Sequence, residues 1–242
     1  MNGEAILSVA GALGFDAPLL ARYGPLLLQG LKTTLELVAI SVPTGFLLAL
    51  VLAYARLEGG PAARGPAAAF MGFFRGTPAL CQLFLIYYGA GQFHAALQSA
   101  GLWWLFRDAF WCAALAFTLN TAAYQAEIIR GAVANLPAGQ REAADALGYG
   151  TPGAWRRVLL PQALLVALRP LGNELILMIK TSSVASVVTV VDVMGATKRA
   201  FSGSLDFEVY LWAALVYLAL VEIVRRVWNA LERRMTRHLR TA

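Results

Sequence analysis

The sequence contains few charged residues, few cysteines and few histidines. Only 14% of its 242 residues are charged and 59% are hydrophobic, with two cysteines and two histidines in all. This balance is too apolar for an ordinary soluble domain and is typical of a membrane protein. Cys81 and Cys112 both fall in apolar stretches, so we interpret them as small core residues rather than a disulfide or a metal pair. No metal site is predicted.

Several functional signatures are also missing. No Gly-x-x-x-x-Gly-Lys-Ser/Thr loop is present to cradle phosphates, and no paired metal ligands or nucleophile–base set indicates an enzyme. The net charge of +6 does not indicate nucleic-acid binding, because the basic residues lie in short loops and at the C-terminus without a basic–aromatic face. Glu4 comes early and a basic n-region is missing, so we expect no cleaved signal peptide.

Five apolar segments are long enough to cross a bilayer. About 20 helical residues, rising about 1.5 Å each, cover a hydrocarbon core of about 30 Å. We therefore predict an all-α membrane protein with five transmembrane helices. A shorter apolar run at 184–193 is interpreted as an outer-face or partly re-entrant element. The predicted spans are 34–55, 77–97, 110–129, 161–180 and 209–227, with a loop over 56–75.

The basic residues predict the orientation of these spans. Thirteen lysines and arginines fall on the side that holds the C-terminus, against six on the other side. The positive-inside bias then places the C-terminus in the cytoplasm and the N-terminus outside. The predicted domains are an outer or interfacial segment (1–29), a transmembrane domain (30–230) and a basic cytoplasmic tail (231–242).

A polar loop between the third and fourth spans, 134–160, stands out from its apolar surroundings. The stretch 137–147 has helix-forming composition and an Arg141/Asp145 pair at i,i+4. Gly148 and Gly150 are predicted to turn the chain with φ > 0, and Thr151 to cap a second helix that starts at Pro152. The loop therefore reads as helix, sharp turn, helix.

Two motifs carry a resemblance to a known family. Glu142-Ala143-Ala144, then Gly148, then Val158-Leu159-Leu160-Pro161 resemble the "EAA" loop of permease subunits of ATP-driven (ABC) importers, with Val158 where isoleucine is usual. Arg75-Gly76-Thr77-Pro78 resembles the "RGTP" signature of the polar-amino-acid branch. This resemblance covers nearly the whole chain, from Gly30 to the arginine-rich end, and is closest to the histidine/lysine-arginine-ornithine and opine permease subunits of that branch.

The resemblance implies a type I ABC importer fold in the bacterial inner membrane. It also implies partners: two ATPase subunits, a second permease subunit (a heterodimer is favoured) and a periplasmic solute-binding protein. ATP and magnesium would bind the ATPases, with no cofactor in this chain. The residues expected to couple to an ATPase are Arg141, Glu142, Ala143, Ala144, Asp145 and Gly148.

Polar residues within the spans are candidates for the translocation pathway, because they are expensive at membrane depth. Glu127 is expected either to pair with Arg130 at i,i+3 or to line the pathway. Asn173 and Glu174 either contact a cationic substrate or make interhelical hydrogen bonds, and the same two possibilities apply to Asn120 and Thr121. Arg169, beside Pro170, is expected to brace a gate or a neighbouring subunit.

Two other functions compete with an amino-acid importer. A passive channel or an ion-coupled carrier would use the intramembrane carboxylates but leaves the polar loop unexplained. An intramembrane enzyme would need a set of reactive side chains that the sequence lacks. Transport in membranes without an ATPase would separate the carrier from the importer.

Overall fold

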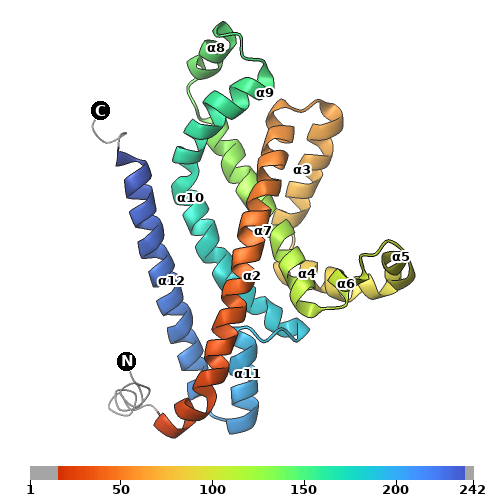
Figure 1. Cartoon of the computed structure of the whole chain (residues 1–242), viewed down its shortest axis with the longest axis vertical. Coiled ribbons are helices and arrows are strands. Elements are labelled where there is room, and N and C mark those ends of the chain that lie inside the picture. The colour runs from red at the N-terminus through yellow and green to blue at the C-terminus, as the bar shows by residue number, and fades with distance from the viewer. Residues whose placement is uncertain (1–15, 238–242) are drawn as a thin grey trace.

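A computed structural model of the chain describes residues 16–237, and every regular element within them is helical (Figure 1). The predicted all-α class is confirmed for this part of the chain. Parts of the predicted N-terminal segment and basic tail, 1–15 and 238–242, lie outside the described residues. The elements are α2 (Ala17–Glu58), α3 (Pro61–Gly76), α4 (Ala79–Tyr87), η1 (Gly89–Phe93), α5 (His94–Ser99), α6 (Trp103–Phe106), α7 (Ala109–Ala134), α8 (Gly139–Ala146), α9 (Thr151–Ala154), η2 (Trp155–Leu159), α10 (Leu160–Thr181), η3 (Ser182–Val188), α11 (Val193–Ser204) and α12 (Glu208–Met235).

Helix α2 runs nearly the whole length of the molecule (Figure 1). Asp16 caps it by accepting a hydrogen bond from the backbone N–H of Leu19 at 3.1 Å. The helix begins at Ala17, well before the predicted start of the first span at Thr34, and the domain boundary predicted after residue 29 falls inside it. The reason is that the apolar residues before Thr34 extend the helix, and Leu27 is buried against α11 and α12.

Helices α2 and α7 pack closely because small residues line their contact. A Cβ added to Gly45 would lie 2.5 Å from Cγ2 of Thr121, so only glycine allows this approach. Ala49 on α2 and Ala122 on α7 are fully buried in the same cluster. The two helices therefore form a tightly fitted centre for the bundle.

The segment after α2 differs most from its prediction. The predicted loop over 56–75 is wrong: α3 occupies 61–76, with Pro61 in its first turn and Met71 buried against α2 and α7. The predicted second span, 77–97, is wrong as a continuous helix. The chain bends by 108° between α3 and the helical segment that begins at Ala79, and the α-helix ends again at Tyr87, before glycines 89 and 91.

The remaining spans follow their predictions more closely. Helices α7 and α10 cover the predicted third and fourth spans, and α12 covers the fifth and continues to Met235, so the boundary predicted after residue 230 also falls inside a helix. The short apolar run 184–193 lies in η3 and the turn into α11. That turn lies toward the end of the bundle where α2 begins (Figure 1).

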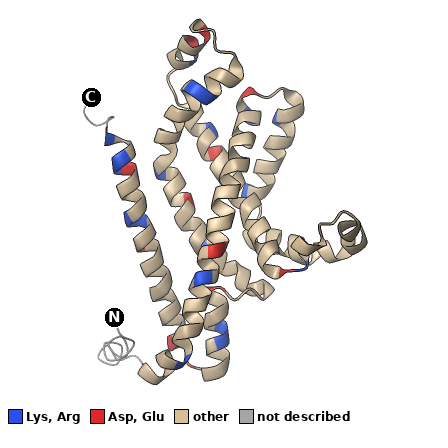
Figure 2. Cartoon of the chain, in the orientation of Figure 1, with Lys and Arg blue, Asp and Glu red and all other residues tan. Residues whose placement is uncertain are grey.

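By length and composition, only some of the described helices could cross a membrane alone. Two segments are long and apolar enough, 17–58 and 151–188, and the bent pair 61–76 with 79–99 could form a third. Helix α7 carries polar residues through its interior, and the last part of α12 is strongly charged. Figure 2 shows charged residues at both ends of the bundle and also along its middle, including a blue and a red turn partway along α2.

Candidate functional site

The polar loop folds as a helix, a sharp turn and a second helix. Helix α8 ends at Ala146, and Gly148, two residues later, has a φ of +75°, the left-handed conformation that glycine adopts most readily. The N–H of Gly148 donates to the carbonyl of Asp145 at 2.9 Å, and that of Tyr149 to the carbonyl of Ala144 at 3.1 Å. This pair of bonds is a Schellman motif, which satisfies the last carbonyls of the helix. The turn predicted at Gly148 is therefore present.

Two details of the predicted loop are wrong. Gly150 has a φ of −68° and itself caps α9, so Thr151 is the first residue of that helix rather than its cap. Arg141 does not pair with Asp145. Its guanidinium instead binds the carboxylate of Glu58, at the end of α2, with Nη1 donating to Oε2 at 3.1 Å. The i,i+4 spacing favoured Asp145 as the partner of Arg141. In the fold, however, the carboxylate of Glu58 lies within reach and accepts from both Nη1 and Nη2 of the guanidinium.

The residues predicted to couple to an ATPase differ in exposure. Ala144 is buried beneath the loop, whereas Glu142, Ala143 and Asp145 are exposed on α8. The exposed side thus presents a small residue flanked by two carboxylates. Leu147, at 74% exposed, extends this surface.

The bend at Thr77-Pro78 is fastened to α7 by side-chain amides. Nε2 of Gln82 donates to the carbonyls of Phe74 and Thr77, at 2.9 and 3.0 Å. Nδ2 of Asn120 donates to Oε1 of Gln82 at 2.9 Å and to the carbonyl of Phe74 at 3.3 Å. These bonds satisfy carbonyls that the end of α3 leaves without helical partners. Asn120 is therefore a structural anchor of the bend.

Residues of α7 that lie nearer the polar loop also contact the end of α3. Glu127 accepts hydrogen bonds from Nε and Nη2 of Arg130, at 2.9 and 2.6 Å, which confirms the predicted i,i+3 pair. A second arginine, Arg75, lies 3.6 Å from the same carboxylate, and the hydroxyl of Tyr124 donates to the carbonyl of Arg75 at 3.4 Å. Arg75, which the sequence places in a loop, thus lies at the far end of α3 and joins the bend to α7.

A separate polar cluster lies inside the bundle. The hydroxyl of Thr121 donates to Oε1 of Glu174 at 3.0 Å, and Nε2 of Gln125 donates to the Thr121 oxygen at 2.9 Å. Glu174 is only 6% exposed. Asn173, its neighbour in sequence, points to the exposed side of α10. The structure therefore brings Thr121 and Glu174 together and leaves Asn120, Glu127 and Asn173 elsewhere.

Sequence reasoning overlooked the roles of Gln82 and Gln125. Both are 2% exposed, and both join elements that are far apart in the chain. The available signal was their position within otherwise apolar stretches, since a buried amide is normally hydrogen-bonded. Nothing in the local pattern indicated which groups they would bind.

The chain is similar in sequence to proteins of a known family. Residues 41–237 match the family described as binding-protein-dependent transport system inner membrane component. The chain belongs to this family. It is 40% identical over 226 residues to the nopaline transport system permease protein of Agrobacterium fabrum, covering 93% of this chain and 94% of that protein. It is 42% identical over 219 residues to an octopine transport system permease protein of Rhizobium radiobacter, covering 90% and 89%.

Solved structures support the same assignment. An amino acid ABC transporter, crystallised with histidines, contains a chain that is 33% identical and superimposes with a TM-score of 0.76, covering 89% of this chain and 96% of that one. A chain of the methionine ABC transporter MetNI has the same fold, with a TM-score of 0.72 at 21% identity. The protein is thus a permease subunit of the ABC importer class, with the type I importer fold.

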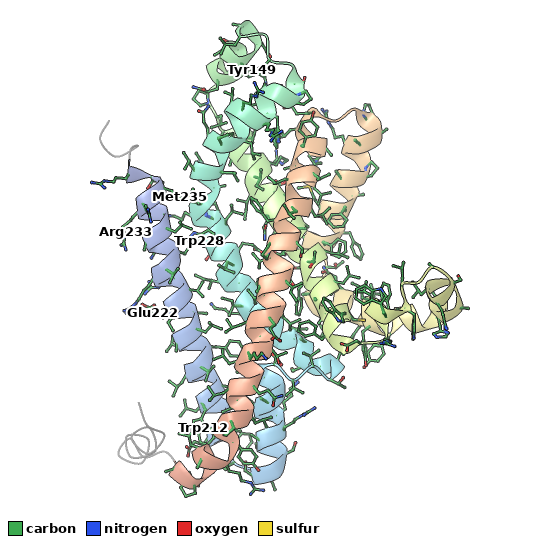
Figure 3. All side chains as sticks on the ribbon, viewed as in Figure 1. Tyr149, Trp212, Glu222, Trp228, Arg233 and Met235 are labelled. Carbon is green, nitrogen blue, oxygen red and sulfur yellow. The ribbon has the colours of Figure 1, made fainter. Side chains whose placement is uncertain are left out.

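The permease joins α10 to α12 near the end that carries the polar loop. Arg169 forms an ion pair with Glu232 at 3.0 Å, and Nε1 of Trp228 donates to the carbonyl of Leu168 at 2.8 Å. Figure 3 shows Trp228 and Met235 on the side of α12 that faces α10, with Glu222 and Arg233 on the outer side. The partner of Arg169 in this chain is therefore α12.

The opposite end of the permease contains a buried carboxylate that sequence reasoning passed over. Asp192 is fully buried and caps α11, with Oδ1 accepting from the N–H of Gly195 at 2.8 Å. Its Oδ2 accepts from the hydroxyl of Tyr217 at 3.2 Å, while Thr34 accepts from the N–H of Val193 at 3.2 Å. Burial raises the pKa of Asp192 to about 6, although these hydrogen bonds oppose the shift. The cluster ties α2, α11 and α12 together.

Proposed function

We propose that this permease imports amino acids, either basic and polar ones such as arginine, histidine, lysine and ornithine, or opines. The names of the nopaline and octopine relatives support this substrate class. So does Glu174, because a buried carboxylate in a transport protein is suited to a cationic substrate group. The observation that carries the importer function is the helix–turn–helix loop, which presents α8 outside the bundle.

Transport requires partners that supply energy and substrate. Two ATPase subunits, which would hold ATP and magnesium, dock against the exposed side of α8. A second, homologous permease subunit completes the membrane pathway, most simply as a heterodimer, and a periplasmic solute-binding protein delivers the substrate. The description of the family as binding-protein-dependent supports the last of these partners. The permease chain itself hydrolyses nothing.

We also propose five membrane crossings in the inner membrane, with the N-terminus periplasmic and the polar loop and C-terminus cytoplasmic. The arginines near the loop and along the end of α12 support this orientation. Cysteines introduced at Asp145 and at Ser99 test it in a background without Cys81 and Cys112. A membrane-impermeant thiol reagent added to intact spheroplasts should label only the cysteine at position 99. Labelling of position 145 alone would reverse the orientation.

Among the candidate translocation residues, we propose Glu174, Thr121 and Asn173 for contact with substrate. Glu174 and Thr121 already form a polar pair, and Asn173 lies on the exposed side of the same helix. Asn120 and Glu127 are engaged at the bend, so we assign them to positioning α3 and α4. Arg75, Gly76, Thr77 and Pro78 belong to that bend as well.

The test is uptake by the complex reconstituted with its binding protein. Arginine, histidine, glutamine, an opine and glutamate are offered in turn, with and without ATP inside the vesicles. ATP-dependent uptake of arginine, histidine or the opine supports the proposal. Preference for glutamate would remove the role of Glu174 toward cations, and uptake without ATP would favour a channel or ion-coupled carrier.

A further inference from the structure

The polar loop is attached to the end of α2 at two points. The guanidinium of Arg141 donates to both carboxylate oxygens of Glu58, although 83 residues separate them. The Glu58 side chain is only 7% exposed, whereas Arg141 remains about half exposed. Hydrogen bonding to Glu58 raises the pKa of the Arg141 guanidinium. A forked pair of this kind defines orientation as well as contact.

The second attachment is aromatic. Trp155, in the π-helical turn that leads into α10, is 7% exposed and packs edge-to-face on Tyr54, with 5.4 Å between ring centroids. Tyr54 and Glu58 are four residues apart, so both lie on one face of α2. The two ends of the loop, α8 and η2, are therefore attached to a single turn of this helix.

The same helix reaches the polar cluster. Gly45 lies 13 residues before Glu58, about 20 Å along an unbroken helix. There, α2 fits so closely that a Cβ on Gly45 would meet Cγ2 of Thr121 at 2.5 Å. Thr121 in turn donates to Glu174. Because packed interiors are poorly compressible, a shift of α2 at Glu58 must displace Thr121 or open a void beside it.

We propose that α2 acts as a lever that carries displacement of the polar loop to the Thr121–Glu174 pair. Glu58 is then a positioning residue for coupling, outside the loop motif itself. The loop contacts α2 through Glu58 and Tyr54, and α2 packs closely against Thr121 at Gly45. This inference rests on the proposed function, because it assumes that an ATPase moves the loop.

The test uses the complete complex in proteoliposomes and the variant Glu58→Gln, which keeps the size of the side chain and removes its charge. Three quantities are measured: co-purified ATPase, ATP hydrolysis stimulated by the binding protein, and substrate imported per ATP hydrolysed. The ATPase should co-purify normally and hydrolysis should continue, while import per ATP falls by roughly fivefold or more, the lower range of typical coupling between sites.

Glu222→Gln is the matched control, because Glu222 pairs with Arg225 and Arg226 within α12 and does not touch the loop. It should leave import per ATP unchanged. Tyr54→Leu removes the aromatic contact with Trp155 without altering charge, and it replaces Glu58→Gln in the experiment if that variant does not fold. It should lower the same ratio.

The outcomes separate the lever from the proposed function. Unchanged import per ATP in Glu58→Gln, or in Tyr54→Leu if that variant is the one that folds, overturns the lever. Loss of the co-purified ATPase in these variants also overturns it, because the contact would then serve assembly. Absence of ATP-dependent uptake in the unaltered complex would instead contradict the proposed function.

Discussion

Thr121 and Glu174 lie on different helices, and a hydrogen bond of 3.0 Å from the threonine hydroxyl to the carboxylate joins them in the interior of the bundle. The bond links α7, which packs against the central helix α2, to α10, which follows the polar loop. Any movement that changes the distance between α7 and α10 must stretch or break it.

Replacing Glu174 with Gln should impair uptake of arginine more than uptake of glutamine. The substitution keeps the size of the side chain and its ability to accept from Thr121, but removes the negative charge available to a cation. Uptake of both substrates by the reconstituted complex measures the difference. Thr121→Val is the control, since it removes the hydroxyl and keeps the charge. Equal losses for the two substrates in Glu174→Gln would show a structural role.

Replacing Gly148 with Asp should uncouple or disassemble the complex. Most residues with a Cβ cost about 1–2 kcal/mol in the left-handed conformation that Gly148 adopts; aspartate costs less than most, but it also adds a second carboxylate three residues after Asp145, so the turn after α8 would shift. Co-purification of the ATPase and ATP-dependent uptake both measure the effect. Gly150→Ala is the matched control, because Gly150 has a negative φ and open space around it. Full uptake with normal ATPase association in Gly148→Asp would contradict this prediction.

Replacing Asn120 with Leu should destabilise the bend between α3 and α4. The substitution leaves Oε1 of Gln82 without its donor and removes one donor from the carbonyl of Phe74, at a cost of about 1–3 kcal/mol. Thermal unfolding of the purified permease in detergent should show a clear drop in Tm. Asn135→Ala, at an exposed helix end, should change Tm much less. An unaltered Tm in Asn120→Leu would mean that water replaces the amide.

Stability of the permease should fall as the pH rises from about 4 to about 6. Burial raises the pKa of Asp192 to about 6 in the folded protein, so the carboxyl keeps its proton up to about that pH, whereas in the unfolded chain it loses the proton near the ordinary aspartate pKa of 3.8. Between these values the unfolded state binds fewer protons, so raising the pH favours unfolding, by up to about 3 kcal/mol for this group.

Thermal unfolding between pH 4.5 and 7.5 measures this dependence. Asp192→Asn should flatten it, because Asn also caps helices and accepts from Gly195 but does not titrate in this range. Tyr217, the other titratable group that faces Asp192, is unaltered in the variant. The same pH dependence in Asp192→Asn would assign the effect to another group.

The sequence determined the features that depend on local spacing and composition. The apolar content established an all-α membrane protein, the positions of α7 and α10 followed from hydrophobic runs, and the pairing of Glu127 with Arg130 followed from an i,i+3 spacing. The turn at Gly148 was predictable because few other residues adopt its conformation at low cost. The loop motif also sufficed to recognise the permease family.

Tertiary structure alone decided the features that join distant parts of the chain. Composition could not show that 61–76 forms a helix or that the chain then bends by 108°, because both depend on packing against α7. Spacing pointed Arg141 to Asp145, but the folded chain brings Glu58 within reach from 83 residues away. Likewise, the sequence shows that Glu174 is polar but does not show its hydrogen-bond partner. Only the packing of α7 beside α10 brings Thr121 within reach of it. A hydrogen bond forms with whichever group the fold places within about 3 Å, and sequence separation carries little information about that distance.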